Sequence, residues 1–340
     1  MSPLDSAPER APVGPRPERL ALAVALVALL VRLVALAEVH GSVWNEVPLG
    51  DARHFEDWGR RIAGGDWLGR EVFYQAPLYP YLLALVETLC GPGRLVVQLL
   101  QIVCAAAAAG LLALSTARTL SPRAGWVAGG LLALYGPAIW YDLQLEKTSL
   151  AVSLTAVLAA FLLSRADSTR RALGAGAMLG ALTLLRENAF VLVVPLALAC
   201  AAERVGRARR TLALALGVAL FLAPVALRNL AVGGALLPTA SNAGVNFYIG
   251  NGLDADGLYR PLVAGRGHPD FEREDATRIA SELAGRALAP AEVSGFWFRL
   301  AGDEIGADPA HFLALLWRKA RLLCFPGEIM DALAFEVYQD

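Results

Sequence analysis

The sequence predicts an all-α membrane protein, a polytopic bundle with about seven membrane spans. Three observations predict this class. Apolar residues make up 56% of the 340 residues and charged residues only 18%, against about 45–50% and about 25% in ordinary soluble domains. Apolar runs follow one another along the chain, and arginines cluster in the connections between them. The formal net charge of −1 leaves no basic field that would attract nucleic acid.

The first span is expected at residues 20–37, an apolar run interrupted only by Arg32. A helix of this length extends about 27 Å, close to the hydrocarbon thickness of a bilayer. A cleaved secretory signal is the alternative, because Ala35-Leu36-Ala37 resembles a cleavage site. Both interpretations place residue 38 outside. The length of the run favours a retained helix, preceded by a flexible cytoplasmic tail of residues 1–19.

The other candidate spans share an apolar composition and lie at residues 95–117, 124–141, 148–163, 172–185, 188–202 and 211–227. Several of the connections contain arginines, namely Arg118, Arg123, Arg165, Arg170, Arg171, Arg204, Arg207, Arg209 and Arg210. If Ala76–Cys90 does not cross, all of them lie on the side of the basic N-terminus, as the positive-inside rule requires. We therefore interpret Ala76–Cys90 as a helix at the outer surface, or as one that re-enters the membrane. An ion pair at mid-membrane is costly, so residues 172–202 are expected to form two helices that turn at Arg186.

Two large segments are then extracytoplasmic. The loop of residues 38–93 contains an amphipathic helix, with Phe55, Trp58 and Ile62 on one face, that is expected to lie along the membrane interface. The chain thus divides into a transmembrane core of residues 20–229, which includes that loop, and an extracytoplasmic segment of residues 230–340.

Within the extracytoplasmic segment, residues 270–308 are predicted to be charged helix. Phe296, Trp297 and Phe298 are the expected anchor of this helix. Residues 309–325 are apolar but contain Arg318, Lys319 and Arg321, so an interfacial helix is favoured over a further span.

Carboxylates in the outer segments are the first candidates for chemistry. Asp51 precedes the amphipathic helix, where it is either an N-cap, which its spacing favours, or a general base aimed at a hydroxyl. Asp142 and Glu146 lie in the short outer link of residues 141–147. They are either solvated loop residues or a pair that orients a substrate or holds a divalent cation through its oxygens.

Cations and amides are the second group of candidates. Arg186 and Arg228 lie at the ends of apolar runs, where they either reach toward the interface or bind a phosphate through the planar guanidinium fork. Lys147 is a further outer cation. The stretch of residues 241–252 is rich in Asn and Gly, and it is either a turn-rich loop or a polar platform over a site. The sequence contains no P-loop, G-x-S-x-G, H-E-x-x-H or dinucleotide fingerprint.

Six pieces of the sequence, taken together, resemble the sequence pattern of a known protein family. In chain order they are Gly50-Asp51-Ala52-Arg53-His54-Phe55-Glu56-Asp57-Trp58, Phe73-Tyr74-Gln75-Ala76-Pro77-Leu78-Tyr79-Pro80-Tyr81-Leu82-Leu83, Tyr141-Asp142-Leu143-Gln144-Leu145-Glu146-Lys147, Leu185-Arg186-Glu187-Asn188, Arg228-Asn229 and the stretch from Asn242 to Asn251. This ordered set resembles the GT-C superfamily of membrane glycosyltransferases that use polyprenyl-phosphate sugars, in the branch of the bacterial protein O-mannosyltransferase and aminoarabinose-transferase relatives. The resemblance covers about residues 20–330, and Arg186-Glu187-Asn188 stands where relatives often have Thr-Arg-Pro.

The resemblance implies a GT-C fold whose first outer loop carries the catalytic acid, which falls on Asp51. It implies a second outer acid, Asp142 or Glu146, and a lipid-phosphate site at Arg186 and Lys147 with Arg228 behind them. Residues in the matching pieces that are candidates for substrate binding are Tyr74, Gln75, Asn242, Asn246 and Tyr248. If the enzyme needs a divalent cation, Mg²⁺ or Mn²⁺, the candidate ligands are Asp51, Asp142 and Glu146.

The function expected from this resemblance is inverting transfer of a sugar from a polyprenyl-phosphate carrier to a hydroxyl of a glycan, lipid or protein. The expected location is the outer face of a bacterial inner membrane, with the bilayer as partner. Non-catalytic alternatives are a transporter or flippase of lipid-linked sugars and a degenerate assembly subunit. Family members usually continue with further spans, whereas this chain ends at Asp340, so a shortened form or a fragment is expected.

Overall fold

The computed structural model describes residues 16–48, 50–163, 168–202, 206–267 and 269–324. The chain is 78% helical, and no strand occurs in these residues, which confirms the all-α class. Most of the predicted N-terminal tail, together with Arg165 and Arg204, lies outside the described residues.

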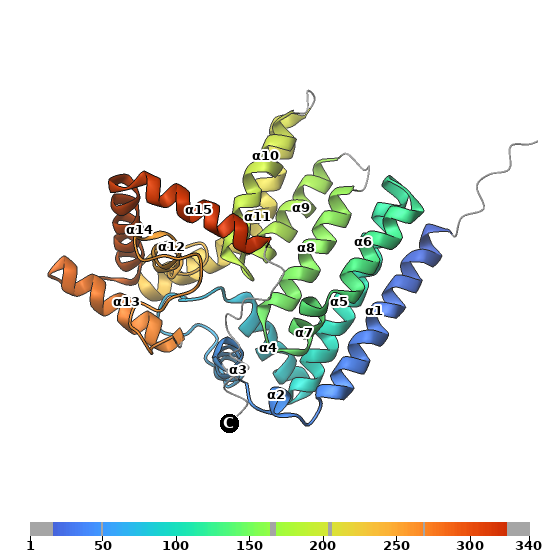
Figure 1. The fold of residues 1–340 in the computed structure, drawn as a ribbon, viewed down its shortest axis with the longest axis horizontal. Coiled ribbons are helices and arrows are strands. Elements are labelled where there is room, and N and C mark those ends of the chain that lie inside the picture. Colours follow the sequence, from blue (N-terminus) through green and yellow to red (C-terminus); the bar gives the residue numbers. More distant parts are fainter. Residues whose placement is uncertain (1–15, 49, 164–167, 203–205, 268, 325–340) are drawn as a thin grey trace, which may run out of the picture.

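The candidate spans correspond to the helices α1 (Pro17–Val39), α5 (Arg94–Thr119), α6 (Pro122–Leu134), α8 (Lys147–Leu163), α9 (Thr169–Thr183), α10 (Val193–Ala202) and α11 (Arg207–Gly233). These helices form a bundle (Figure 1). In the described part of the chain, three of them are long and apolar enough to cross a membrane, namely α1, α5 and α11. The chain therefore has the helices of a membrane protein, and the full set of seven crossings stays a prediction.

Two of the predicted runs are interrupted. The run at 124–141 was expected to be one span, but α6 ends at Leu134 and a separate helix α7 (Gly136–Leu143) follows. The break falls at Tyr135, and Pro137 lies in the first turn of α7, where its missing N–H is tolerated; in a continuous helix it would lack the backbone hydrogen bond. The break predicted near Arg186 is confirmed, since α9 ends at Thr183 and the 3₁₀ helix η1 (Glu187–Leu192) leads into α10.

Side-chain contacts tie the basic helix ends together at one end of the bundle. Arg118 at the end of α5 pairs with Glu18 at the start of α1 at 2.5 Å. Thr119 donates to the carbonyl of Leu163 at the end of α8 at 3.2 Å, and Arg171 of α9 donates to the carbonyl of Phe161 at 3.1 Å. The residues of the predicted outer face lie at the opposite end, around α2 (Val43–Glu46), α3 (Gly50–Ala63), α4 (Leu78–Cys90) and α7 (Figure 1).

Glycines allow α9 and α11 to pack side by side. A Cβ added at Gly176 would lie 2.1 Å from the carbonyl oxygen of Leu214, and one added at Gly217 would lie 2.2 Å from that of Leu173. No larger residue fits at these two positions unless α9 and α11 move apart. Small residues at such contacts are typical of helix pairs in membranes, where close backbone approach maximises van der Waals packing.

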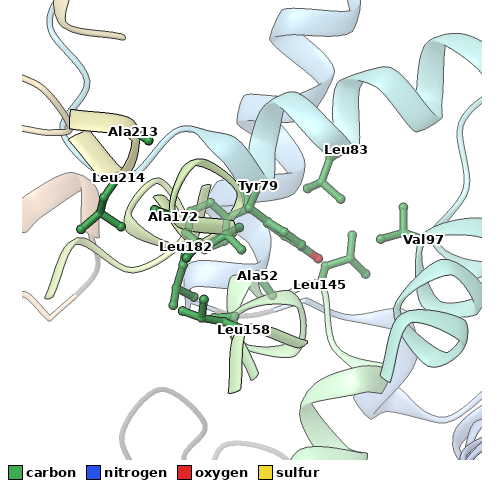
Figure 2. Packing of buried hydrophobic residues seen from close by; sticks show 14 residues of the cluster. Ala52, Tyr79, Leu83, Val97, Leu145, Leu158, Ala172, Leu182, Ala213 and Leu214 are labelled. Atoms are coloured by element: carbon green, nitrogen blue, oxygen red, sulfur yellow. The ribbon is translucent and has the colours of Figure 1, made fainter. Parts of the chain in front are cut away.

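A buried apolar cluster joins α3 and α4 to the bundle. It includes Ala52 and Phe55 of α3, Tyr79 and Leu83 of α4, and Leu182 of α9, and Figure 2 shows members of this cluster converging from α3, α4, α8, α9 and α11.

The apolar face predicted on α3 exists, but Phe55 and Ile62 are buried in the protein. This face is therefore covered by protein at these two residues, and the position of the helix along the membrane interface stays a prediction. Burial against protein removes the same apolar area from water that a bilayer would.

As far as residue 324, the chain after α11 forms the helices α12 (Ala243–Asn251), α13 (Pro269–Ala284), α14 (Pro290–Ala307) and α15 (Pro309–Leu323). The charged helix predicted at 270–308 is therefore two helices, which separate at Gly285, where φ is +66°. The centre of the expected anchor packs inside the protein. Trp297 is buried against Val245 and Ala276, and its indole donates to the Ala276 carbonyl at 3.1 Å. On α15, which matches the predicted interfacial helix, Leu313 and Trp317 are exposed.

Candidate functional site

A cavity of about 710 Å³ lies between the starts of α3 and α8 and the helices after α11. Its lining comes from many separate segments of the chain: Gly50, Asp51, Gln75, Lys147, Arg186, Glu187, Asn188, Asn242, Ala243, Asn246, Phe247, Asn251, Tyr259, Gly267, Glu272 and Phe298. Six of the residues predicted from the sequence are among them: Asp51, Gln75, Lys147, Arg186, Asn242 and Asn246. Carboxylates, cations and amides thus face one space, whose volume lies in the range of small-molecule sites.

Asp51 stands in the first turn of α3, which begins at Gly50. The helix therefore starts before Asp51, and the N-cap role that its spacing favoured does not fit this boundary. Asp51 is half-buried, and its carboxylate forms no hydrogen bond or ion pair with any described residue. A carboxylate without a protein partner at a cavity wall is available to accept a proton or a hydrogen bond from a ligand.

Lys147 is the first residue of α8 and is only 7% exposed. Its ammonium lies 5.3 Å from the ring centroid of Phe55, and within the described residues it has no carboxylate partner. A helix N-terminus carries partial positive charge, so a lysine there increases a positive potential that favours an anion.

The turn that presents Lys147 is held by the polar side chains of α5. The Gln101 amide donates to the carbonyls of Asp142 and Gln144 at 3.0 and 2.8 Å, and the Gln98 amide donates to that of Leu143 at 2.7 Å. Both glutamines are buried. They occupy positions within an apolar run, where the sequence reasoning did not identify them.

Arg186 lies in the break between α9 and η1, and its guanidinium donates to the Thr148 hydroxyl. Thr148 follows Lys147, so this contact brings the end of α9 to the start of α8. Glu187 and Asn188 continue the same wall of the cavity. One Glu187 oxygen is buried without a hydrogen-bond partner among the described residues.

The amides come from two segments that pair through their backbones. The Ser241 N–H donates to the Phe73 carbonyl at 2.9 Å, and the Asn242 N–H donates to the Tyr74 carbonyl at 3.3 Å. Asn229 at the end of α11, which is fully buried, accepts from the Phe73 N–H at 3.2 Å and donates to the Leu237 carbonyl at 2.9 Å. These bonds hold Gln75 and Asn242 at the cavity.

Glu272 of α13 is the site residue that the sequence reasoning missed. It is 9% exposed, and its two oxygens accept hydrogen bonds from the hydroxyls of Tyr74 at 2.8 Å and Tyr259 at 2.9 Å. Burial, followed by the charge of Glu272, raises the pKa of Tyr74 far above its usual range, so this phenol stays a donor. Local sequence gives no signal for Glu272, because α13 contains several similar acids.

The two acids of residues 141–147 do not line this cavity. Asp142 is buried, accepts from Arg32 at 2.6 Å and from the Ser149 hydroxyl at 2.5 Å, and so joins α1, α7 and α8. Glu146 is also buried. In the part of the chain that the structure describes, no group of three or more His, Cys, Asp or Glu side chains is placed to hold a metal ion. Asp51, Asp142 and Glu146 therefore do not form a cation site in this arrangement.

Three other predicted residues lie around the cavity rather than in its lining. Arg228 donates to the carbonyls of Leu68 and Glu71, stacks 3.8 Å from the Phe73 centroid and faces a neighbouring cavity of about 350 Å³. Tyr74 faces this same neighbouring cavity. Tyr248 lines a third cavity, where its hydroxyl donates to Glu304 at 3.4 Å.

Comparison with known protein families finds a match to part of the chain. The model of the dolichyl-phosphate-mannose-protein mannosyltransferase family matches residues 74–227. No curated protein and no solved structure matches the chain. The matched segment runs from the loop before α4 into α11 and contains Gln75, Lys147 and Arg186, whereas Asp51 and Glu272 lie on either side of it. Residues 74–227 are thus similar to a GT-C superfamily domain, which confirms the resemblance read from the sequence and suggests a membrane glycosyltransferase.

Proposed function

We propose that the chain is an inverting glycosyltransferase that moves a sugar from a polyprenyl-phosphate carrier to an acceptor hydroxyl. The observation that carries this proposal is one cavity that contains both the carboxylate of Asp51 and the buried ammonium of Lys147. Among the described residues, Asp51 has no hydrogen-bond or ion-pair partner and Lys147 has no carboxylate partner. The family match supports the reaction type. The lipid-linked donor, the acceptor, which is a glycan, lipid or protein, and the outer face of a bacterial inner membrane are parts of the proposal.

The anionic end of the donor is assigned to the start of α8. Lys147, the first-turn amides of α8 and the guanidinium of Arg186 supply positive potential at one wall of the cavity. A phosphate there places its sugar in the cavity and leaves its polyprenyl chain free to follow the apolar helices into the bilayer.

The reaction is a displacement at the anomeric carbon. The acceptor oxygen forms a bond to this carbon while the bond from the carbon to the phosphate oxygen breaks, and the electron pair leaves with the polyprenyl phosphate. Asp51 takes the proton of the acceptor hydroxyl as the new bond forms, since an alcohol is too weak an acid to lose it beforehand. Lys147 and Arg186 stabilise the negative charge on the departing phosphate. Attack opposite the leaving group inverts the configuration.

The test replaces Asp51 with asparagine, which has nearly the same shape but cannot accept the proton. We expect D51N to lose about 10²–10⁴-fold in transfer rate while it binds polyprenyl-phosphate mannose within a few-fold of the wild type. The matched control is Asp57→Asn on the same helix, since Asp57 is solvent-exposed and pairs with Arg53 and Arg60 outside the cavity.

Full activity of D51N would remove this residue from the mechanism. If the wild type binds the lipid-linked sugar without ever releasing polyprenyl phosphate, it is not a transferase. A transporter or an assembly subunit would then be the better interpretation.

A further inference from the structure

The carboxylate of Glu272 is a buried acceptor with open positions toward the cavity. Its two oxygens each accept one phenolic hydrogen, from Tyr74 and from Tyr259. A carboxylate has about four lone-pair directions. No other hydrogen bond or ion pair reaches Glu272 from the described residues. Each oxygen therefore retains one direction in which it can accept from a ligand.

The cations closest to Glu272 in sequence are engaged elsewhere. Arg273 pairs with Glu71, and Arg266 pairs with Asp275 at 2.7 Å. Among the described residues, the hydrogen-bond partners of Glu272 are two neutral phenols, which hold the carboxylate in one orientation. A rigid carboxylate whose two oxygens lie side by side is suited to accept from two neighbouring hydroxyls.

From this arrangement we infer that Glu272 is a specificity residue that binds two adjacent hydroxyl groups of a carbohydrate in the cavity. The inference rests on the proposed function, and it assigns sugar recognition to the segment after α11, outside the matched residues 74–227. The hydroxyl pair belongs either to the sugar of the lipid-linked donor or to a carbohydrate acceptor.

A purely structural role for Glu272 predicts a different result. The bond to Tyr74 ties α13 to the loop before α4, and Arg273 with Glu71 ties the same two elements. If Glu272 only held α13 against the loop before α4, loss of its charge would lower stability and leave the preference for individual sugar hydroxyls unchanged.

The test measures this preference as a ratio of dissociation constants, which does not depend on the fraction of folded protein. In the first arm, polyprenyl-phosphate mannose and its monodeoxy analogues are titrated into the wild type and into E272Q. In the second arm, methyl α-mannoside and its monodeoxy analogues are titrated into the same proteins saturated with polyprenyl phosphate. E71Q is the matched control, because Glu71 lies at the same junction but does not line the cavity.

We expect the wild type to bind analogues that lack either of two neighbouring hydroxyls on the order of 10–100-fold more weakly than the parent, the usual range for a hydrogen bond to a charged group. E272Q should bind the parent more weakly by a similar factor and should no longer discriminate, whereas E71Q should behave like the wild type. Loss of discrimination in the first arm assigns the hydroxyls to the donor, and loss in the second arm alone assigns them to an acceptor.

In E272Q the new amide hydrogens face a phenol that also donates. The double variant E272Q/Y259F removes this conflict and is used if the single variant does not fold. Unchanged discrimination in both arms overturns the role of Glu272 and leaves the proposed function intact. Failure of the wild type to bind either probe overturns the proposed function, and this inference with it.

Discussion

The ion pair between Arg32 and Asp142 allows a direct test of whether Asp142 has a structural or a catalytic role. The two residues are 110 positions apart, and their side chains are 0% and 3% exposed. Removing one partner of a buried pair leaves an uncompensated charge and typically costs about 3–5 kcal/mol. We expect Arg32→Met to reach this range, because the Asp142 carboxylate would retain only its bond from Ser149.

Asp142→Asn should cost less than Arg32→Met, at or below the lower end of that range. The guanidinium would keep the Ala133 carbonyl at 2.9 Å and the Ala28 carbonyl at 3.3 Å, and the new amide can still accept from Ser149. The double variant R32M/D142N removes both charges. It should therefore regain most of the lost stability, as buried pairs replaced together usually do.

The assay is equilibrium unfolding in mixed micelles for the wild type, both single variants and the double variant, together with the rate of sugar transfer. Because Asp142 does not line the cavity, the double variant should transfer sugar within a few-fold of the wild type. The reasoning is refuted if Asp142→Asn is as stable as the wild type and inactive, with the double variant also inactive. Asp142 would then act in the chemistry.

Three further outcomes are expected. Lys147→Gln should weaken polyprenyl-phosphate binding in calorimetry on the order of 10–100-fold through loss of a charged hydrogen-bond donor, and unchanged affinity would place the phosphate elsewhere. Gly244→Ala should cost about 1–3 kcal/mol in unfolding experiments, because its Cβ would lie 1.9 Å from a backbone oxygen of α14, while Gly302→Ala, with open space around it, should not destabilise. Hydrogen bonds from Arg286 lower the pKa of Glu292 from 4.5 to about 2, so ionised Glu292 stabilises the fold above pH 4.5 and this contribution disappears as the pH falls toward 2. The stability difference between wild type and E292Q should therefore be present at pH 6 and absent at pH 2.

Much of the site was predictable because it lies where local patterns change. Asp51 begins an amphipathic helix, Lys147 begins α8, and Arg186 interrupts an apolar run. An ionisable group at the edge of an apolar run must lie near the ends of a bundle, since its burial among lipid tails is costly. Antiparallel connections then bring such edges to the same end of the molecule.

The roles of individual acids were less predictable. The sequence reasoning selected Asp142 and Glu146, which lie in a short link between apolar runs, and missed Glu272, which lies among several acids of a charged helix. Their surroundings differ because Asp142 meets Arg32 of α1, whereas Glu272 meets Tyr74 from the loop before α4. Both partners are more than 100 positions away along the chain. A local pattern of residues cannot indicate contacts between positions so far apart.

By itself, the sequence determined the helical class, the apolar runs, the break at Arg186 and the end of the bundle at which the polar residues gather. These properties follow from composition and spacing, which act over one or two helical turns. Only the tertiary structure decided that Asp142 forms an internal ion pair, that Trp297 lies in a hydrophobic core, and that Glu272 lines the cavity. The physical reason is that the energy of a charge depends on the atoms within a few ångströms of it, and packing brings those atoms together from distant parts of the chain.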